Sequence, residues 1–359
     1  MSLKTQFDGM VFENPLMPAA GPLNGDLEKL LFLHHAGVGG MVTKTISTQE
    51  PHIPKPCIYA EKDRVMNSEL WSEHSYERWI DTFLPGYMAV KDRPLIISVG
   101  YSDQDMECLI PKLEPFADAF EVSTHYVGTD LKKIAHTVKT IRKLTAKPLY
   151  MKISPHIPSP EAFAKEVYEA GASGIVAINS VGPTMKIDIP KRKAIYGNDQ
   201  GFVWTSGPII KPIALAIVKK IKSAVPQMTV IGVGGIQSAD DVIEFLLAGA
   251  SGVQMLSSAL IKGKQLYQQV ISDLPEALKK HQFTSVEAVI RTHLEHSVKY
   301  EAGLPKLIES RCIRCGLCEK VCPYFAIEDP GVITFIDDKC FRCGLCVSRC
   351  PTQAIEMDI

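Results

Sequence analysis

Eight of the ten cysteines lie in the last fifth of the chain, in two segments with the spacing C-x2-C-x2-C-x3-C-P. The segments read CIRCGLCEKVCP from Cys312 and CFRCGLCVSRCP from Cys340. This spacing is typical of modules that bind two [4Fe–4S] clusters, because three closely spaced thiolates can hold three corners of one cubane. The C-terminal part of the chain therefore predicts electron transfer through two iron–sulfur clusters.

The ligands of each predicted cluster come from both segments, because the fourth cysteine of such a run binds the other cluster. We assign Cys312, Cys315, Cys318 and Cys350 to the first cluster, and Cys322, Cys340, Cys343 and Cys346 to the second. The two segments also match beyond the ligands, at Pro323 and Pro351 and at Ala326 and Ala354. The pattern indicates an internal duplication with crossed ligation.

Two structural zinc sites are the alternative, because paired CxxC motifs often bind zinc, but zinc does not require this spacing twice. Disulfide bonds are less expected, since MSLKTQFDGM does not resemble a signal peptide and such clusters belong in a reducing compartment. We therefore expect a cytoplasmic protein. A net charge of −1 argues against nucleic acid or an anionic membrane as the main partner. No apolar run reaches the roughly 18 residues of a membrane span.

Eight short β-rich or apolar runs precede the cysteine segments, and a helical pattern follows each run. They are PLMPAA (15–20), GMVTKT (40–45), PLIISVG (94–100), AFEVST (119–124), PLYMKIS (148–154), GIVAIN (174–179), TVIGVGG (229–235) and GVQMLSS (252–258). Eight such units predict a (β/α)8 barrel, with an open doubly wound sheet as the competing fold. We favour the barrel because polar or glycine residues collect where the strands end, which would form one rim. The barrel is expected over residues 1–305, followed by a small α+β ferredoxin-like domain over 306–359.

The seventh and eighth units predict a phosphate site. Gly234 and Gly235 follow a strand and precede a helix whose expected cap is Ser238, so backbone N–H groups can face an anion there. Ser257 and Ser258 follow the eighth strand, and these two loops are the usual phosphate site of the barrel fold. Because the chain also carries redox clusters, it needs a carrier that converts single electrons to hydride, and FMN is the expected occupant.

Lys44 and Lys152 each end a strand that is otherwise apolar. A lysine at such a depth is costly unless it faces a charge. A reduced flavin carries negative charge near N1, which an ammonium group would stabilise. The alternative for each lysine is an ion pair with a carboxylate of the rim.

Several segments of the chain together resemble the FMN barrel of the dihydroorotate and dihydropyrimidine dehydrogenase family, over residues 8–295. They are PLMPAAGPLNGD, MVTKT, NSELWSEHSYERW, PLYMKIS, AINS, TSGPIIKPIAL and IGVGGIQSADD. The N-x-E-L-x-S-E pattern from Asn67 to Glu73, combined with the C-terminal cysteine module, resembles the dihydropyrimidine dehydrogenases rather than the orotate-forming enzymes, which show N-S-M-G at this place.

The resemblance implies a flavin site and a substrate site. The implied FMN residues are Ala20, Gly21, Thr43, Lys44, Lys152, Ser206, Gly207, Gly234, Gly235, Ser257 and Ser258. The implied substrate residues are Asn67, Glu69, Asn179 and Ser180, whose amide and carboxylate groups can pair with the N–H and C=O edges of a pyrimidine ring. Capping of loop backbone is the structural alternative for the two asparagines.

The chain departs from the family on the loop after the fourth strand, where EVSTHY stands in place of N-L-S-C-P-N or N-L-S-C-P-H. The acid/base cysteine of the family falls on Thr124, whose hydroxyl is a far weaker acid. His125 is a candidate for the same proton, with an ordinary loop histidine as its alternative, and Tyr126 is another candidate. The flavin- and substrate-facing asparagine falls on Glu121. The predicted catalytic residues are thus Thr124, His125 and Lys152, and Glu121 joins the predicted substrate residues.

The leading hypothesis is an FMN-dependent oxidoreductase that acts on the 5,6 bond of a ring such as uracil or thymine. No G-x-G-x-x-G opens a βαβ unit, so the electrons are expected from another protein, either an NAD(P)H-oxidising flavoprotein subunit or a ferredoxin. We also expect a homo-oligomer. The changed loop at Thr124 motivates two alternatives: an electron-relay subunit without substrate chemistry of its own, or the same flavin chemistry on another cyclic enone or amide.

Overall fold

The computed structural model describes residues 1–124, 128–295, 300–329 and 331–358. The chain divides into two compact units, Met1–Leu294 and Glu295–Ile359. The first unit contains all eight predicted strand runs, and the second contains all eight clustered cysteines. Among the described residues, every helix is too short or too polar to cross a membrane.

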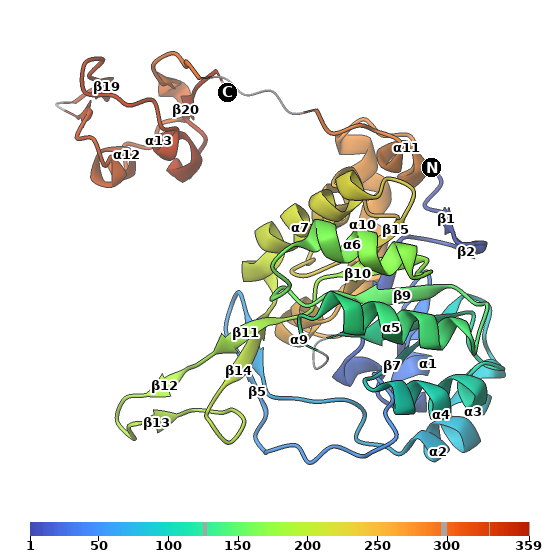
Figure 1. Cartoon of the computed structure of the whole chain (residues 1–359). Helices are drawn as coiled ribbons and strands as arrows, with labels where there is room; N and C mark the ends of the chain where they lie inside the picture. The colour runs from blue at the N-terminus through green and yellow to red at the C-terminus, as the bar shows by residue number, and fades with distance from the viewer. Residues whose placement is uncertain (125–127, 296–299, 330, 359) are drawn as a thin grey trace. The chain divides into compact units, whose positions relative to one another are not determined.

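An eight-stranded parallel barrel forms the centre of the first unit (Figure 1). Its strands are β3 (Leu16–Pro18), β4 (Met41–Val42), β7 (Leu95–Val99), β8 (Ala119–Ser123), β9 (Leu149–Lys152), β10 (Gly174–Ala177), β15 (Thr229–Val233) and β16 (Gly252–Met255). They pair in the order β3-β16-β15-β10-β9-β8-β7-β4, and every pair is parallel. Each predicted run contains one of these strands. The barrel prediction is therefore confirmed, and the open doubly wound alternative is wrong.

Helices surround the barrel strands (Figure 1). The longer ones are α1 (Leu27–His35), α4 (Asp103–Leu113), α5 (Leu131–Arg142), α6 (Pro160–Glu169), α7 (Lys211–Ala224), α8 (Ala239–Leu247) and α10 (Leu266–Lys280). Shorter segments are η1 (Pro22–Asn24), α2 (Tyr76–Arg78), η2 (Trp79–Phe83), α3 (Leu84–Met88), η3 (Pro208–Ile210), α9 (Ser257–Lys262) and α11 (Val286–Ile290). Helix α5 is representative, because Ile134, Val138 and Ile141 lie on one buried stripe and the Asp130 side chain accepts a hydrogen bond from Lys132 N.

Asn24 bridges the two ends of the strand order. Its Nδ2 donates to the carbonyl oxygen of Ala19 after β3 (3.0 Å) and to that of Val42 in β4 (2.7 Å). Its Oδ1 accepts from Gly21 N (2.9 Å). Nearby, Gly39 N donates to the Leu16 carbonyl (2.8 Å). A fully buried side chain thus links β3 to β4 and fixes the Ala20–Gly21 backbone at the rim.

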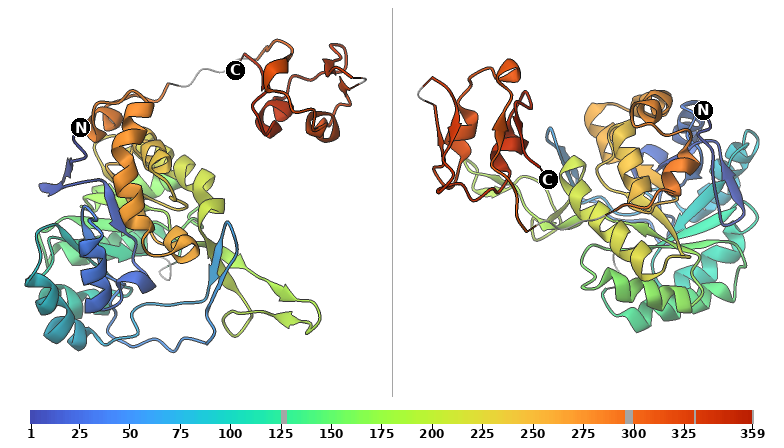
Figure 2. Two further views of the ribbon diagram at one scale, coloured as in Figure 1. Left: turned by 180° about the vertical axis from the view of Figure 1, so that it is seen from behind. Right: turned by 90° about the horizontal axis from the view of Figure 1, so that it is seen from above.

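The barrel interior is apolar at one end and polar at the other. A hairpin of β1 (Thr5–Phe7) and β2 (Met10–Phe12) packs Phe7 and Phe12 against interior side chains such as Tyr150. Further along the strands, toward their carboxyl ends, the interior becomes polar, with fully buried Glu121 and Gln254. Figure 2 shows the N-terminal hairpin on the opposite side of the unit from β5, β11 and β14. The polar layer therefore faces the rim where a barrel carries its active site.

Two insertions add a second sheet to the first unit. Its antiparallel strands pair in the order β11-β14-β6-β5. Their bounds are β5 (Ile58–Ala60), β6 (Val65–Asn67), β11 (Val181–Thr184) and β14 (Val203–Ser206), and a further hairpin consists of β12 (Ile187–Asp188) and β13 (Lys193–Ala194). This sheet brings Asn67 opposite Trp204, from segments far apart in the chain.

The second unit consists of two similar halves. Its elements are β17 (Lys306–Leu307), η4 (Glu309–Arg311), α12 (Leu317–Val321), β18 (Ile327–Glu328), β19 (Thr334–Phe335), α13 (Leu345–Arg349) and β20 (Ile355–Glu356). β17 pairs with β20 and β18 with β19. Gly316 and Gly344 precede the two short helices at φ of 65° and 75°, a conformation that glycine adopts without strain.

Candidate active site and cluster sites

A cavity opens at the carboxyl ends of the barrel strands. Its volume is about 150 Å3. Its lining includes eight predicted site residues: Ala20, Gly21, Asn67, Glu69, Lys152, Asn179, Ser180 and Ser206. The barrel rim and the second sheet therefore bring predicted flavin and substrate residues together around one space.

The predicted phosphate loops lie beside this cavity. Gly207, Gly234 and Ser257 each follow a lining residue in the chain. Ser206 and Ser257 share a hydrogen bond of 2.7 Å between their hydroxyl oxygens. Ser258 Oγ is buried, and it has no hydrogen-bond partner among the residues that the structure describes. A buried hydroxyl without a partner is a donor that a bound anion can satisfy.

Gly235 lets two of these loops approach each other. Its φ is +81°, and a Cβ at this position would lie 2.9 Å from the Gly207 carbonyl oxygen. Gly207 itself has φ of +100°. On the following helix, Ser238 accepts a hydrogen bond from Asp241 N (3.2 Å), so Ser238 is the helix cap as predicted. The Asp241 carboxylate accepts from Ser238 Oγ (2.8 Å) and Gln237 N (2.9 Å).

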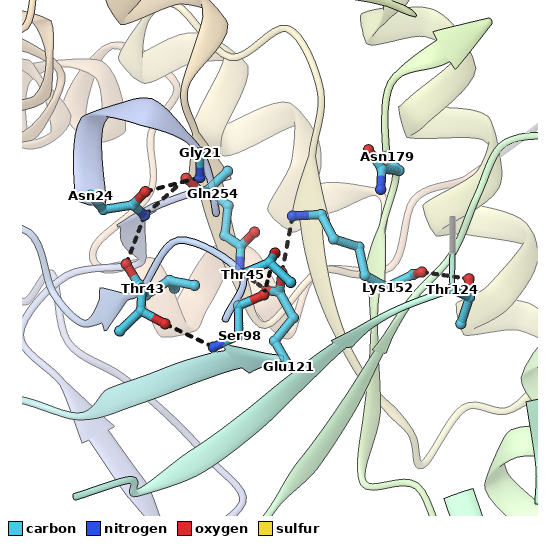
Figure 3. A network of polar contacts seen from close by, with 12 residues as sticks. Gly21, Asn24, Thr43, Thr45, Ser98, Glu121, Thr124, Lys152, Asn179 and Gln254 are labelled. Carbon is cyan, nitrogen blue, oxygen red and sulfur yellow. Dashed lines mark hydrogen bonds and ion pairs between the residues drawn. The ribbon is translucent and has the colours of Figure 1, made fainter. Parts of the chain in front are cut away.

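Lys152 belongs to a buried polar network inside the barrel mouth (Figure 3). Its Nζ lies 3.0 Å from Glu121 Oε1, and Glu121 Oε2 accepts a hydrogen bond from Gln254 Nε2 (2.7 Å). Glu121 is fully buried and does not line the cavity, whereas Lys152 does. The structure therefore places Glu121 against Lys152 rather than at the predicted substrate position. The ion-pair alternative for Lys152 is present.

Lys44 is also paired with carboxylates. Its Nζ lies 2.7 Å from Glu69 Oε1 and 2.6 Å from Glu73 Oε2, while its side chain is only 2% exposed. Burial acts to raise the pKa of Glu73, but the Lys44 hydrogen bond and charge outweigh it and lower the pKa below 4.5. Thr43 is buried beside Lys44, and its hydroxyl accepts from Ser98 N (3.0 Å). Neither Thr43 nor Lys44 is part of the cavity lining.

The two predicted substrate asparagines both line the cavity. Asn67 Nδ2 donates to the Trp204 carbonyl oxygen over a long 3.4 Å. Asn179 Oδ1 accepts from Ser180 N (2.8 Å). Each amide is thus partly used to hold local backbone, as the structural alternative expects, and each still borders the cavity.

The predicted acid/base loop follows β8. Thr124 is buried, and its hydroxyl donates to the Lys152 carbonyl oxygen (2.8 Å). Thr124 is absent from the cavity lining, whereas its neighbour Ser123 belongs to it. His125 and Tyr126 lie outside the described residues. The geometry therefore gives Thr124 a structural contact, and its acid/base role stays a prediction.

Sequence reasoning missed several residues of the site. Asn24 and Gln254 shape its polar network, and Tyr101 and Trp204 line its walls. The sequence could have indicated Gln254, because it is a polar residue inside the otherwise apolar strand GVQM. No sequence pattern indicates Tyr101 and Trp204, since their position depends on how the segments around them fold over the rim.

The clustered cysteines surround two separate cavities in the second unit. One is lined by Cys312, Cys315, Cys318 and Cys350. The other is lined by Cys322, Cys340, Cys343 and Cys346. Each set combines three cysteines of one segment with the fourth of the other, as crossed ligation requires. Within the described ranges, no three cysteine, histidine, aspartate or glutamate side chains gather closely enough to hold a single metal ion.

The surroundings of these thiols differ. Burial raises the pKa of Cys346 to about 11. Burial also acts to raise the pKa of Cys350, but hydrogen bonds from the backbone, including Ala354 N at 3.2 Å, lower it below its ordinary value. Because a metal binds thiolates, cluster binding would release protons from such sites.

Comparison with known proteins agrees with this two-part organisation. The family model of dihydroorotate dehydrogenase matches residues 2–278. A second model, described as a 4Fe-4S dicluster domain, matches residues 305–357. The second match favours iron–sulfur clusters over the zinc alternative.

Curated relatives match about four fifths of the chain at moderate identity. The catalytic subunit of dihydroorotate dehydrogenase B (NAD(+)) from Pyrococcus horikoshii is 33% identical over 300 residues, which is 80% of this chain and 96% of the relative. The subunit of the same name from Pyrococcus furiosus is 31% identical over 302 residues, 81% of this chain and 98% of the relative. The subunit from Oceanobacillus iheyensis is 30% identical over 304 residues, which is 81% of this chain and 98% of the relative.

Proposed function

Because the chain belongs to the dihydroorotate dehydrogenase family and is thus an oxidoreductase of CH–CH bonds, we propose that it interconverts a pyrimidine ring such as uracil or thymine and the 5,6-dihydro form. It would use FMN and two [4Fe–4S] clusters. The observation that carries this proposal is the shared cavity: Lys152 and Gly21 border it on the barrel side, and Asn67 and Asn179 offer amides to a ring.

The described residues fit FMN. The partnerless Ser258 hydroxyl and the close approach of Gly235 to Gly207 suit a phosphate held by backbone N–H groups. Ala20 and Gly21 offer backbone at the rim, and Lys152 offers an ammonium group. FMN, when bound, supplies hydride exchange with the ring carbon and single-electron exchange with the clusters.

The two cysteine-lined cavities would hold the clusters, each through four thiolates. Reduction of a ring C=C bond consumes two electrons and two protons. The clusters would pass the electrons singly. An electron-donor protein would supply them, either an NAD(P)H-oxidising flavoprotein subunit or a ferredoxin. The word "subunit" in the relatives' names is consistent with such a partner.

A neutral ring fits the charges around the cavity better than an acidic one. Glu69 borders the cavity, and its carboxylate can accept from a ring N–H. The same carboxylate, although its charge is partly offset by Lys44, would disfavour the carboxylate of orotate. Lys152, the cation of the lining, already faces Glu121. These charges support uracil or thymine as the ring.

We propose that the proton is exchanged from the loop after β8, by Thr124 or His125. If His125 is the acid, the pH profile of kcat/KM has an ionisation limb that His125→Gln removes. Thr124→Ala then lowers kcat by less than about tenfold, because its hydroxyl serves mainly to bind the Lys152 carbonyl. A loss of a thousandfold or more in Thr124→Ala, with the limb retained in His125→Gln, would assign the proton to Thr124 instead.

Dihydroorotate is the second candidate substrate, and the names of the relatives favour it. Anaerobic mixing of the flavin-loaded protein with dihydrouracil or dihydroorotate separates the two. We expect bleaching of the flavin absorbance by dihydrouracil and a spectral shift on adding uracil. Bleaching by dihydroorotate alone would contradict the neutral-ring proposal. No response to either would favour another cyclic substrate or an electron-relay subunit.

A further inference from the structure

We infer that Glu121 sets the charge that the flavin meets in the barrel mouth, by pairing with Lys152 from behind. Glu121 is a positioning residue, since it reaches the cavity only through Lys152. It orients the ammonium group and offsets much of its charge, so that the flavin has a lower reduction potential than Lys152 alone would give. This inference rests on FMN as the cofactor of the proposed function.

Both oxygens of the Glu121 carboxylate are used in contacts with buried side chains of the barrel. Oε1 lies 3.0 Å from Lys152 Nζ, and Oε2 accepts from Gln254 Nε2 at 2.7 Å. Glu121 is 0% exposed, on the interior face of β8, and its strand neighbours are Ser98 on β7 and Tyr150 on β9. A buried carboxylate of this kind needs a cation and further hydrogen bonds, and here it has both.

Lys152 and Glu121 lie at different depths behind the cavity wall. Lys152 borders the cavity and Glu121 lies behind it, so a negative charge that develops in the cavity meets the ammonium group first. The carboxylate one step further away opposes that attraction, and it does so strongly because both charged side chains are buried. The pair therefore stabilises a reduced, anionic flavin less than an unpaired lysine would.

Glu121 is also a departure from the family that the chain resembles. Where the resembled family has an asparagine, this chain has a glutamate, and an amide cannot neutralise a lysine. The substitution changes the net charge of the barrel mouth by one unit. In the described structure, Glu121 does not occupy the cavity lining that a substrate contact would require. Tuning of Lys152 is the role that its position allows.

The test uses the flavin-loaded full-length protein and three variants. Glu121→Gln removes the carboxylate charge and keeps the shape. Gln254→Leu removes the other hydrogen bond to Glu121 and keeps the charge, so it is the matched control. Glu121→Gln/Lys152→Gln removes both charges, and it covers the case in which Glu121→Gln alone fails to fold with an unpaired lysine.

Two readouts report the charge without depending on turnover: the two-electron potential of the flavin, and the Kd for sulfite, whose addition to oxidised flavin places negative charge near N1. We expect Glu121→Gln to raise the potential and lower the sulfite Kd by about tenfold or more. Gln254→Leu should change the Kd less than about threefold, and the double variant should lie near the wild type.

The opposite results would overturn the inference. One is a flavin potential in Glu121→Gln that is unchanged from wild type or lower. The other is a potential in the double variant that falls well below wild type, which would show that Glu121 does not offset the charge of Lys152. These failures differ from failure of the proposed function: a wrong cofactor would appear as wild-type protein without flavin, and a wrong substrate as flavin that dihydrouracil does not bleach. Wild-type protein that holds FMN but shows no effect of Glu121→Gln refutes the inference alone.

Discussion

Lys44 Nζ lies 2.7 Å from Glu69 Oε1. The Glu69 carboxylate, which borders the cavity, is therefore held by a buried ammonium group that follows strand β4. The same ammonium group contacts Glu73 at 2.6 Å. Strand β4 is thereby joined to the segment that carries two of the predicted substrate residues, Asn67 and Glu69. The ion pairs fix Glu69 at the rim and neutralise part of the charge that a substrate meets.

Glu73→Gln tests this junction through its pH dependence. Because the pKa of Glu73 is lowered below 4.5, its ionised form stabilises the fold above the unfolded-state pKa, and this stabilisation is lost as pH falls through the folded-state pKa. We expect the variant to lose about 1 kcal/mol of unfolding free energy at pH 7, a value discounted for the partial exposure of Glu73. Urea unfolding at pH 7 and pH 4 should show the difference between variant and wild type narrowing at the lower pH.

Glu13→Gln is the matched control for that experiment, because the Lys4–Glu13 pair is largely exposed. It should leave the unfolding free energy unchanged at both pH values. A Glu73→Gln difference that stays constant or grows toward pH 4 would contradict the assigned role of the Lys44 pair.

Asn24→Ala tests how the barrel closes. The substitution removes two hydrogen bonds to the carbonyls of Ala19 and Val42 and leaves those groups buried, so we expect a loss of about 2–3 kcal/mol. FMN retention after gel filtration should also fall, because Asn24 holds Gly21 N. Asn14→Ala is a matched control, since Asn14 also bonds two backbone groups, Gly37 O and Leu16 N. It should cost similar stability and leave flavin retention intact.

The sequence predicted the parts of the fold that depend on local pattern. Each barrel strand is a short apolar run, and its position in the chain was sufficient to locate it. The cysteine spacing likewise predicted which thiols share a cavity, because a duplicated segment imposes the pairing. Ser238 was recognised as a cap from its place before an apolar helix.

The parts that sequence could not supply depend on pairing between distant segments. Glu121 and Gln254 come from opposite sides of the strand order, and nothing local connects them. The second sheet joins β6 to β14 across two insertions, so its aromatic wall at Trp204 had no signature in either segment. For Lys44 and Lys152 the sequence predicts that a carboxylate could be the partner, but it does not predict which residue supplies it.

Crossed ligation predicts the outcome of paired cysteine substitutions. Cys312→Ser/Cys350→Ser removes two ligands of one cluster and should retain the other, with about four iron atoms per chain. Cys340→Ser/Cys350→Ser removes one ligand from each cluster and should lose iron from both. Iron analysis and electron paramagnetic resonance of the reduced proteins measure this. Cys108→Ser, in α4 of the barrel unit, should retain both clusters. The reverse pattern, with about four iron atoms retained in Cys340→Ser/Cys350→Ser and iron lost from both clusters in Cys312→Ser/Cys350→Ser, would argue against crossing.

Gly235→Ala tests the phosphate loops. A Cβ at Gly235 would lie 2.9 Å from the Gly207 carbonyl oxygen, so the two loops must separate. We expect FMN affinity to fall at least about tenfold, because the backbone N–H groups are displaced. Gly9→Ala is the control, since Gly9 also has a positive φ of +78° but no atom within 4 Å of its added Cβ. Gly9→Ala should lose about 1 kcal/mol of stability from its positive φ alone, Gly235→Ala should lose more because of the clash, and only Gly235→Ala should lose flavin. Equal flavin affinity in the two variants would remove the loops from the cofactor site.

The cofactor content of the anaerobically purified full-length protein tests the central claim most directly. Iron, acid-labile sulfide, FMN and zinc are measured on one preparation. We predict about eight iron atoms, about eight sulfides and about one FMN per chain, with no zinc at stoichiometric level. Protein that contains zinc in place of iron, or clusters without flavin, would contradict the account of a flavin barrel coupled to two clusters.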